Sequence, residues 1–187
     1  LDALPDISRA FATHDGVGPF FPYEREPETM ARPWAIPGQP GMEHRVGGIE
    51  KDARTGNVSY LPEIHELMTR ERAEKVARIQ DDIPDVATYG EGSELLVLGW
   101  GSTYGAIRTA VNRIHKDGAS VTHAHLRHIN PFPKNLGDVL SRYDRILIPE
   151  INLGQLSRLI RAEYGVESIG YNRVLGQPLM ARDIESK

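Results

Sequence analysis

A glycine-rich turn, "GWGSTYG" from Gly99 to Gly105, has residue types that could hold a phosphate or another anion. It lies between an apolar stretch and an amphipathic one, which is the order of strand, turn and helix in nucleotide-binding proteins. Free backbone N–H groups at a helix start attract anions, and Ser102 or Thr103 would cap the helix or add a donor beside Gly101. A dinucleotide fingerprint needs its third glycine one place earlier, and a P-loop needs a lysine. The spacing therefore favours a structural turn and leaves an anion site open.

The acidic residue that a dinucleotide fingerprint also needs is replaced by the basic stretch "HAHLRH". Side chains alternate along a strand, so His123, His125 and Arg127 are expected on one face. Two histidines at this spacing can bind a metal, but a catalytic zinc site needs a third protein ligand, and none is apparent. A sheet edge, a subunit contact or an anion-facing surface is the favoured interpretation, with Arg127 able to bind a carboxylate or phosphate.

A third polar group, in "PEINLGQL", follows the next expected strand. Open α/β sheets bind ligands or partners at this carboxyl edge. Glu150 has no visible partner that would tune it for catalysis, so capping and interface hydrogen bonds are the favoured role. No catalytic residue or metal ligand is assigned. The candidate anion-binding or interface edge consists of Gly101, Ser102, Thr103, His125, Arg127, Glu150, Asn152 and Gln155.

Composition narrows the classes of function. The 187 residues are 40% hydrophobic and 26% charged, values close to those of globular domains. A net charge of -4 gives no general attraction to nucleic acid or to an anionic membrane. The chain has no cysteine, so it cannot form disulfides or supply thiolates to zinc or to an iron–sulfur cluster. Without a long apolar run or the features of a signal peptide, it is expected to be cytoplasmic, with no nucleic-acid or membrane partner.

The chain changes character along its length. Prolines and glycines interrupt residues 1–60, yet aromatic residues such as Phe11 and Trp34 are too frequent there for a solvated linker. This segment is expected to pack on other protein, as a piece of a longer chain would, the alternative being an intact protein with an ordered arm. "RTGN" predicts a tight turn, residues 61–80 predict a helix, and residues 81–94 predict a boundary.

Residues 95–187 alternate between strand and helix patterns. Strands are expected at 95–98, 121–129, 145–151 and near 168–174, with helices between them. Asn135 is expected to cap the short helix that follows it. Parallel strands joined by helices predict an α/β fold: a mostly parallel sheet with helices on both faces.

Four stretches of this region, "VLGWGSTYGAI", "HLRHINPFPKNL", "LIPEINLGQLSRLIR" and "YNRVLGQP", resemble the C-terminal part of the alpha subunit of 2-oxoacid:ferredoxin oxidoreductases. The earlier stretch "AIPGQPGMEHRVGGIEKDARTGNVS" resembles the segment that closes the family's pyrimidine-binding domain. "NLGQL" favours the 2-oxoglutarate branch over the pyruvate branch.

The resemblance implies three parts. Residues 1–60 would be the end segment of an upstream thiamine-pyrimidine-binding domain, and residues 61–94 a connecting helix and linker. Residues 95–187 would be an α/β domain like the transketolase C-terminal domain, which keeps the shape of a nucleotide fold without a nucleotide.

The implied activity is oxidative decarboxylation of a 2-oxoacid with coenzyme A, which gives acyl-CoA, carbon dioxide and reduced ferredoxin. The beta subunit would carry thiamine diphosphate, Mg and the [4Fe–4S] cluster, so this chain alone is expected to bind no cofactor and to be inactive. Its partners would be the beta subunit, ferredoxin, CoA and the 2-oxoacid. The alternatives are a non-catalytic docking and assembly module, or an anion- or nucleotide-binding α/β domain.

Overall fold

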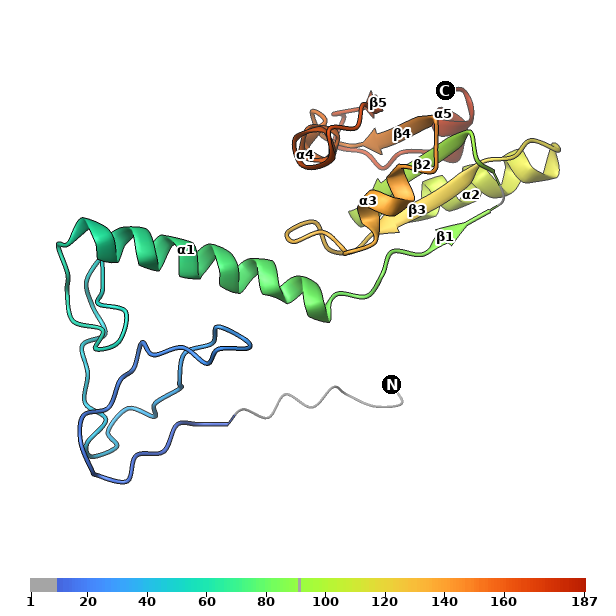
Figure 1. Cartoon of the computed structure of the whole chain (residues 1–187). Coiled ribbons are helices and arrows are strands. Elements are labelled where there is room, and N and C mark those ends of the chain that lie inside the picture. The colour runs from blue at the N-terminus through green and yellow to red at the C-terminus, as the bar shows by residue number, and fades with distance from the viewer. Residues whose placement is uncertain (1–9, 91) are drawn as a thin grey trace. The chain divides into compact units, whose positions relative to one another are not determined.

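The structure is a computed structural model that describes residues 10–90 and 92–187 (Figure 1). It divides into two compact units, Leu1–Ile79 and Gln80–Lys187, which are called here the N-terminal unit and the α/β unit. The three-part division at residues 60 and 94 remains a prediction. Within the described residues no helix is both long enough and apolar enough to cross a membrane.

The N-terminal unit contains one long helix, α1 (Pro62–Arg78), which confirms the predicted helix. Pro62 occupies its first turn, where a missing N–H group costs nothing because that group has no partner inside the helix. Met68 is the only residue of α1 that is buried, so the helix exposes most of its surface. Its charged side is supported by pairs four residues apart, such as Glu66 with Arg70.

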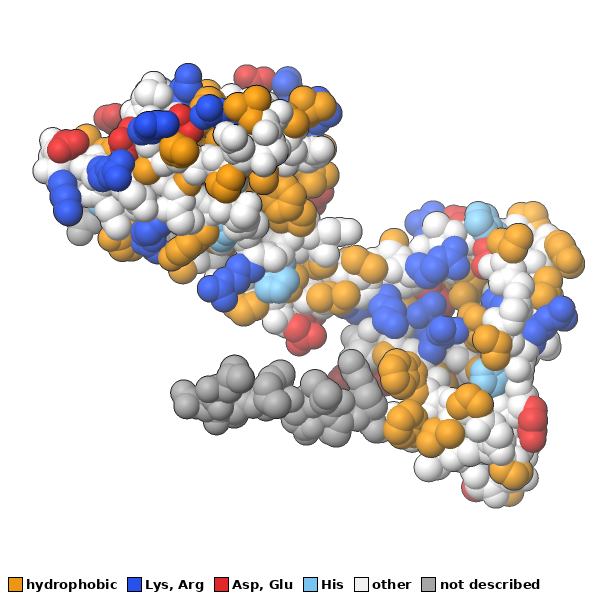
Figure 2. Space-filling model, turned by 180° about the vertical axis from the view of Figure 1, so that it is seen from behind, with side chains coloured by type: hydrophobic (Ala, Val, Ile, Leu, Met, Phe, Trp, Pro, Cys, Tyr) orange, Lys and Arg blue, Asp and Glu red, His pale blue; other side chains and the backbone are white. Residues whose placement is uncertain are grey.

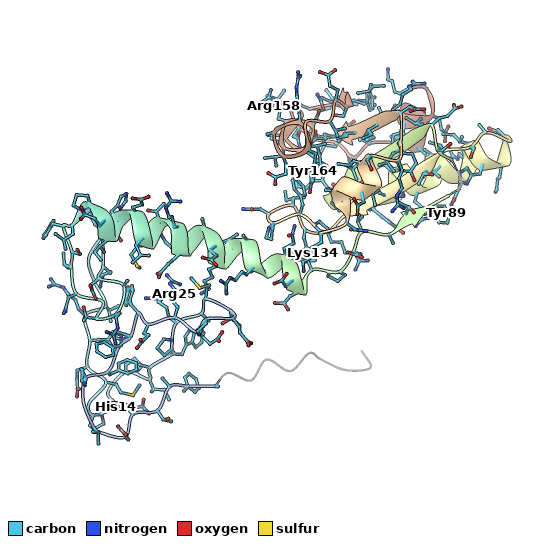
Figure 3. All side chains as sticks on the ribbon, viewed as in Figure 1. His14, Arg25, Tyr89, Lys134, Arg158 and Tyr164 are labelled. Carbon is cyan, nitrogen blue, oxygen red and sulfur yellow. The ribbon has the colours of Figure 1, made fainter. Side chains whose placement is uncertain are left out.

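Residues 10–61 of the N-terminal unit are irregular and are held by specific contacts. Arg25 reaches α1, where its Nε donates to Glu71 at 2.8 Å (Figure 3). Lys51 is buried, and its Nζ donates to the backbone carbonyls of Arg45 and Gly56. A bridge between Lys51 and Val58 closes the predicted "RTGN" turn, which is confirmed.

The aromatic residues of this unit contact one another and nearby cations. The rings of Phe11 and Trp34 lie 6.4 Å apart, and the Arg54 guanidinium lies 4.2 Å from the centre of the Phe21 ring. Phe11 and Trp34 nevertheless expose 51% and 57% of their surface. Their packing on other protein stays a prediction.

The α/β unit is built on one five-stranded sheet in the order β1-β3-β2-β4-β5 (Figure 1). All neighbouring pairs are parallel except β1 with β3, so the predicted mostly parallel sheet is confirmed. The strands are β1 (Thr88–Tyr89), β2 (Leu95–Trp100), β3 (Thr122–Leu126), β4 (Arg145–Glu150) and β5 (Ile169–Asn172).

Helices cover both faces of this sheet, as the sequence predicted. Side chains at even positions of β2, β3 and β4 pack with α3 (Leu136–Leu140) and α4 (Gln155–Tyr164). Odd positions such as Val97 and Leu147 pack with α2 (Tyr104–Lys116) and α5 (Ala181–Glu185). Two apolar cores therefore sandwich the sheet, in agreement with the predicted α/β fold with helices on both faces.

Several local predictions were wrong. β3 ends at Leu126 rather than Ile129, and α5 was not foreseen. The predicted boundary segment contains strand β1, which adds a two-residue edge strand to the sheet. Asn135 does not cap α3, because its side chain instead bonds both the N–H and the carbonyl of Val86 at 2.9 Å. A tertiary partner has displaced the local cap.

The glycine-rich turn after β2 is shaped by steric needs. A Cβ on Gly99 would lie 2.4 Å from Ile107 Cδ1 and 3.0 Å from His125 Nδ1, so only glycine lets α2 approach the sheet this closely. Gly101 has a φ of +57°, which most side chains avoid. Gly105 faces open space within α2. The first two glycines fix the turn and the third is free to vary.

We therefore expect Gly99→Ala and Gly105→Ala to act in opposite directions. Gly99→Ala should lower the free energy of unfolding by about 1–3 kcal/mol, because the added Cβ would force the fully buried Ile107 side chain to shift within a packed core. Gly105→Ala should be neutral or stabilising by up to about 1 kcal/mol, because alanine is the better helix former. Denaturant unfolding measures both, and equal effects would contradict the packing argument.

Candidate functional site

The polar residues at the carboxyl edge of the sheet are largely engaged in holding the fold. Gly101–Thr103 form a short 3-10 turn, η2, between β2 and α2. Thr103 is buried, and its Oγ1 donates to the Trp100 carbonyl at 2.8 Å and accepts from the Trp100 N–H at 3.2 Å. Ser102 is exposed. Thr103 thus closes the turn and does not offer its hydroxyl to a ligand.

Glu150 is completely buried at the end of β4. Its carboxylate accepts from the N–H groups of Leu156 at 2.9 Å and Ser157 at 3.2 Å, in the first turn of α4, and from Trp100 Nε1 at 3.2 Å. A negative charge at a helix N-terminus is also favoured by the helix dipole. This is the capping role that the sequence favoured for Glu150.

The neighbouring polar side chains act in the same region. Asn152 Oδ1 accepts from the N–H groups of Gly154 at 2.8 Å and Gln155 at 3.1 Å, which shapes the loop into α4. Gln155 is exposed. The structure therefore links Glu150 to the turn after β2 through Trp100, while Asn152 serves its own loop.

A separate groove of about 980 Å³ opens in the α/β unit, beside the edge strand β1. Its lining comes from residues 84–89, from the start of the glycine-rich turn, from Tyr104 and Arg108 of α2, and from β3 with the loop after it. Three residues of the predicted edge line it: Gly101, His125 and Arg127. The groove is a candidate site because three residues that carry unpartnered buried polar atoms, Arg108, His123 and His125, line it.

His123 lies on the wall of this groove with only 2% of its surface exposed. Neither ring nitrogen has a hydrogen-bond partner among the described residues. Burial lowers the pKa of His123 to about 4, with smaller contributions from His125 and from the Arg108 guanidinium. The imidazole is therefore neutral at physiological pH, with one donor and one acceptor nitrogen.

His125 is half-buried on the same face of β3, two residues along. Burial lowers its pKa and Arg127 adds to this, whereas a hydrogen bond with the Gly101 backbone acts in the opposite direction. Its Nδ1 has no partner among the described residues. The Tyr104 ring joins the pair, with its centre 5.6 Å from that of His123 and 5.0 Å from that of His125.

Arg108 brings a fixed positive charge to this cluster. Its guanidinium lies 3.4 Å from the centre of the Tyr89 ring on β1, and its Nη2 donates to the Tyr104 hydroxyl at 3.1 Å. Nη1 is buried and has no partner within the described part of the chain. The Tyr89 hydroxyl donates to Asn112 at 2.9 Å, which orients the ring under the guanidinium.

Only part of this cluster was predictable from the sequence. The shared face was predicted correctly for His123 and His125, but β3 ends before Arg127, which is exposed and lies at the groove rim. The spacing of Tyr104 and Arg108, four residues apart on α2, was an available signal. No group of three or more His, Asp or Glu residues that could hold a metal ion occurs within residues 10–90 and 92–187.

Comparison with known proteins gives a consistent result, although no model of a protein family matches the chain. The 2-oxoglutarate oxidoreductase subunit KorA of Mycobacterium tuberculosis is 45% identical over 184 residues, which is 98% of this chain and 28% of the relative. Subunit alpha of 2-oxoacid:ferredoxin oxidoreductase 1 of Aeropyrum pernix is 32% identical over 79% of this chain and 24% of its own length.

A solved structure agrees with these relatives. The 2-oxoglutarate:ferredoxin oxidoreductase from Magnetococcus marinus, with 2-oxoglutarate, coenzyme A and succinyl-CoA bound, has a TM-score of 0.83 and 31% identity over 93% of this chain and 31% of that chain. The predicted resemblance to alpha subunits of 2-oxoacid:ferredoxin oxidoreductases is confirmed. Two of the three proteins are of the 2-oxoglutarate type by name. The chain spans less than a third of the length of each.

The buried histidine predicts a pH-dependent stability. An unfolded histidine has a pKa of about 6.5, so between about pH 6.5 and 4 the unfolded chain binds a proton that folded His123 does not bind. The free energy of unfolding should therefore fall as the pH drops through this window, by about 2 kcal/mol for His123 alone between about pH 7 and 5.

The variant His123→Phe should remove this part of the pH dependence, as measured by denaturant unfolding at both pH values. The exposed-site variant Ser102→Ala should keep the wild-type dependence. A His123→Phe curve parallel to that of the wild type would show that burial of His123 does not depress its pKa.

Proposed function

We propose that this chain is part of the alpha subunit of a 2-oxoacid:ferredoxin oxidoreductase of the 2-oxoglutarate type. The reaction would convert 2-oxoglutarate and coenzyme A to succinyl-CoA and carbon dioxide and pass two electrons to ferredoxin. The observation that carries this proposal is the 45% identity to the Mycobacterium tuberculosis subunit over 98% of the chain. The ligands named for the Magnetococcus marinus enzyme support the same substrates.

Within that subunit we assign residues 1–60 to the end of a pyrimidine-binding domain and residues 61–94 to a connection. Residues 95–187 would form the α/β domain. The irregular fold of residues 10–61, with the exposed side chains of Phe11 and Trp34, supports a segment completed by other protein. Strand β1 falls within the connection, so the connection would also supply the edge of the sheet.

The cofactors are proposed to be held mainly outside this chain. With no cysteine anywhere in its sequence, the chain has no thiolate for a [4Fe–4S] cluster. By the resemblance to this family, the beta subunit would supply the cluster, together with the diphosphate and Mg site of thiamine diphosphate. When bound there, thiamine diphosphate supplies the carbanion chemistry of decarboxylation.

The carboxyl edge of the sheet is proposed to be structural and to face the partner subunit. Glu150 is committed to the start of α4 and to Trp100, which leaves no free carboxylate there for acid–base catalysis. Exposed apolar side chains such as Ile151 and Leu153 lie beside it, and Figure 2 shows hydrophobic and charged side chains intermingled on the surface of the unit. Exposed apolar side chains such as these suit the core of a subunit interface, which is more apolar than its rim.

Reconstitution tests this proposal. The full-length subunit that contains this chain, combined with its beta subunit, should reduce ferredoxin with 2-oxoglutarate only when CoA is present, and should prefer 2-oxoglutarate to pyruvate. The 187-residue chain alone should show no turnover. Turnover by the chain alone would contradict the proposed division of labour, and an assembled complex that used pyruvate but not 2-oxoglutarate would contradict the proposed substrate.

A further inference from the structure

We propose that the groove beside β1 is a binding site for a phosphate group, taken from inorganic phosphate or a small phosphate monoester, with Arg108, His123 and His125 as its polar contacts. All three residues lie in the α/β unit, so the site is complete without the N-terminal unit. The inference goes beyond the proposed oxidoreductase function and stands or falls independently of it.

The three residues carry four buried polar atoms that have no hydrogen-bond partner among the described residues. Arg108 Nη1, both ring nitrogens of His123 and His125 Nδ1 are buried around the Tyr104 ring and make no hydrogen bond within the described residues. Leaving such atoms unpaired costs about 1–3 kcal/mol each. Elsewhere in the described residues, only Gln39 has a buried side-chain atom in this condition. The concentration of these atoms in one groove indicates a ligand that satisfies several of them together.

The charged groups of the groove favour an anionic ligand. Arg108 is permanently positive, and Arg127 adds a second positive group at the rim. Arg108 lines the same groove as His123 and His125, so its charge acts on a ligand bound beside the two imidazoles. Asp85 is the one carboxylate in the lining and is exposed. No group of three His, Asp or Glu residues that could hold a metal ion occurs among the described residues, so an anion is favoured over a metal.

The two unpaired nitrogens of His123 favour a phosphate over a carboxylate. A neutral imidazole presents one N–H donor and one acceptor nitrogen, and both nitrogens of His123 are unpaired. An ionised carboxylate only accepts hydrogen bonds, so it would leave the acceptor nitrogen unsatisfied. A phosphate with a second pKa near 6–7 keeps a P–OH group in part of its population at neutral pH and can both accept and donate.

The groove also has the size and walls of a ligand site. Its volume of about 980 Å³ is at the upper end of the range of about 300–1,000 Å³ typical of small-molecule pockets. The Tyr89 ring packs on one face of the Arg108 guanidinium, and the Tyr104 hydroxyl accepts a hydrogen bond from Nη2. The guanidinium is therefore held in place before a ligand arrives. Such preorganisation lowers the entropy that binding costs.

The test is a titration of the chain with sodium phosphate near neutral pH and at constant ionic strength, followed by the NMR signals of the histidine rings. Loss of single signals in His123→Phe and His125→Phe assigns them. The signals of His123 and His125 should shift in a saturable manner. Sodium sulfate, which has no proton to donate, should bind more weakly. Glycerol phosphate distinguishes the two sources, because tighter binding than inorganic phosphate identifies the site as one for monoesters.

Two arginines of α2 provide a matched pair of variants. Arg108→Gln should weaken phosphate binding by about tenfold or more, because a charge-assisted contact is lost. Arg113→Gln, which removes an exposed arginine paired with Glu185, should leave binding within about twofold, since it lies outside the groove lining. If Arg108→Gln does not fold, as judged by circular dichroism, Arg108→Lys replaces it and should also bind more weakly.

The proposal is overturned if phosphate causes no saturable shift of the His123 and His125 signals. It is equally overturned if sulfate binds as tightly as phosphate, or if the Arg108 and Arg113 variants bind alike. None of these results depends on oxidoreductase activity, so the failure of this inference and the failure of the proposed function can be told apart.

Discussion

The buried carboxylate of Glu150 is the interaction on which the carboxyl edge of the α/β unit depends. A charged group with no exposure to water is tolerated only when hydrogen bonds replace its hydration. Glu150 obtains them from two N–H groups at the start of α4 and from the indole of Trp100. The Glu150 side chain therefore connects the end of β4 to the start of α4 and to Trp100 at the end of β2. It fixes the positions of two loops at the same edge of the sheet.

The groove beside β1 belongs to the same sheet, but the polar side chains that line it are not fully hydrogen-bonded within the fold. On the face covered by α2 and α5, the odd positions of β2 and β4 meet apolar side chains. At β3 the corresponding positions are His123 and His125, and they meet Tyr104 and Arg108 instead. Glu150 has its polar atoms satisfied from within the fold, whereas His123 has not. The fold thus separates a polar group used for stability from a polar cluster suited to a ligand.

The sequence predicted those elements whose apolar residues repeat at a strand or helix period. β2, β4 and α4 were predicted because their apolar residues recur over several positions at a strand or helix period. β1 has two residues, which is too short for a period to show, and α5 buries only Ile184, so it has no apolar repeat. The partnership of Asn135 with Val86 was missed because it joins residues 49 positions apart and overrides a local capping preference.

The candidate site shows the same limit. His123 and His125 were placed on one face because alternation along a strand is a local rule. Tyr89 and Arg108 were not linked to them, since their contact depends on how β1 and α2 approach β3, which no local pattern encodes. Glu150 was assigned a capping role correctly, but its bond to Trp100 crosses between two loops and became visible only in the fold.

The central claim, that Glu150 holds the carboxyl edge together, is tested most directly by the free energy of unfolding of Glu150→Ala compared with Gln155→Ala. Glu150→Ala should lose about 3 kcal/mol, because three donors lose their acceptor in a buried site. Gln155→Ala, at an exposed position five residues along, should change stability by less than about 0.5 kcal/mol. Equal and small losses in the two variants would contradict the claim.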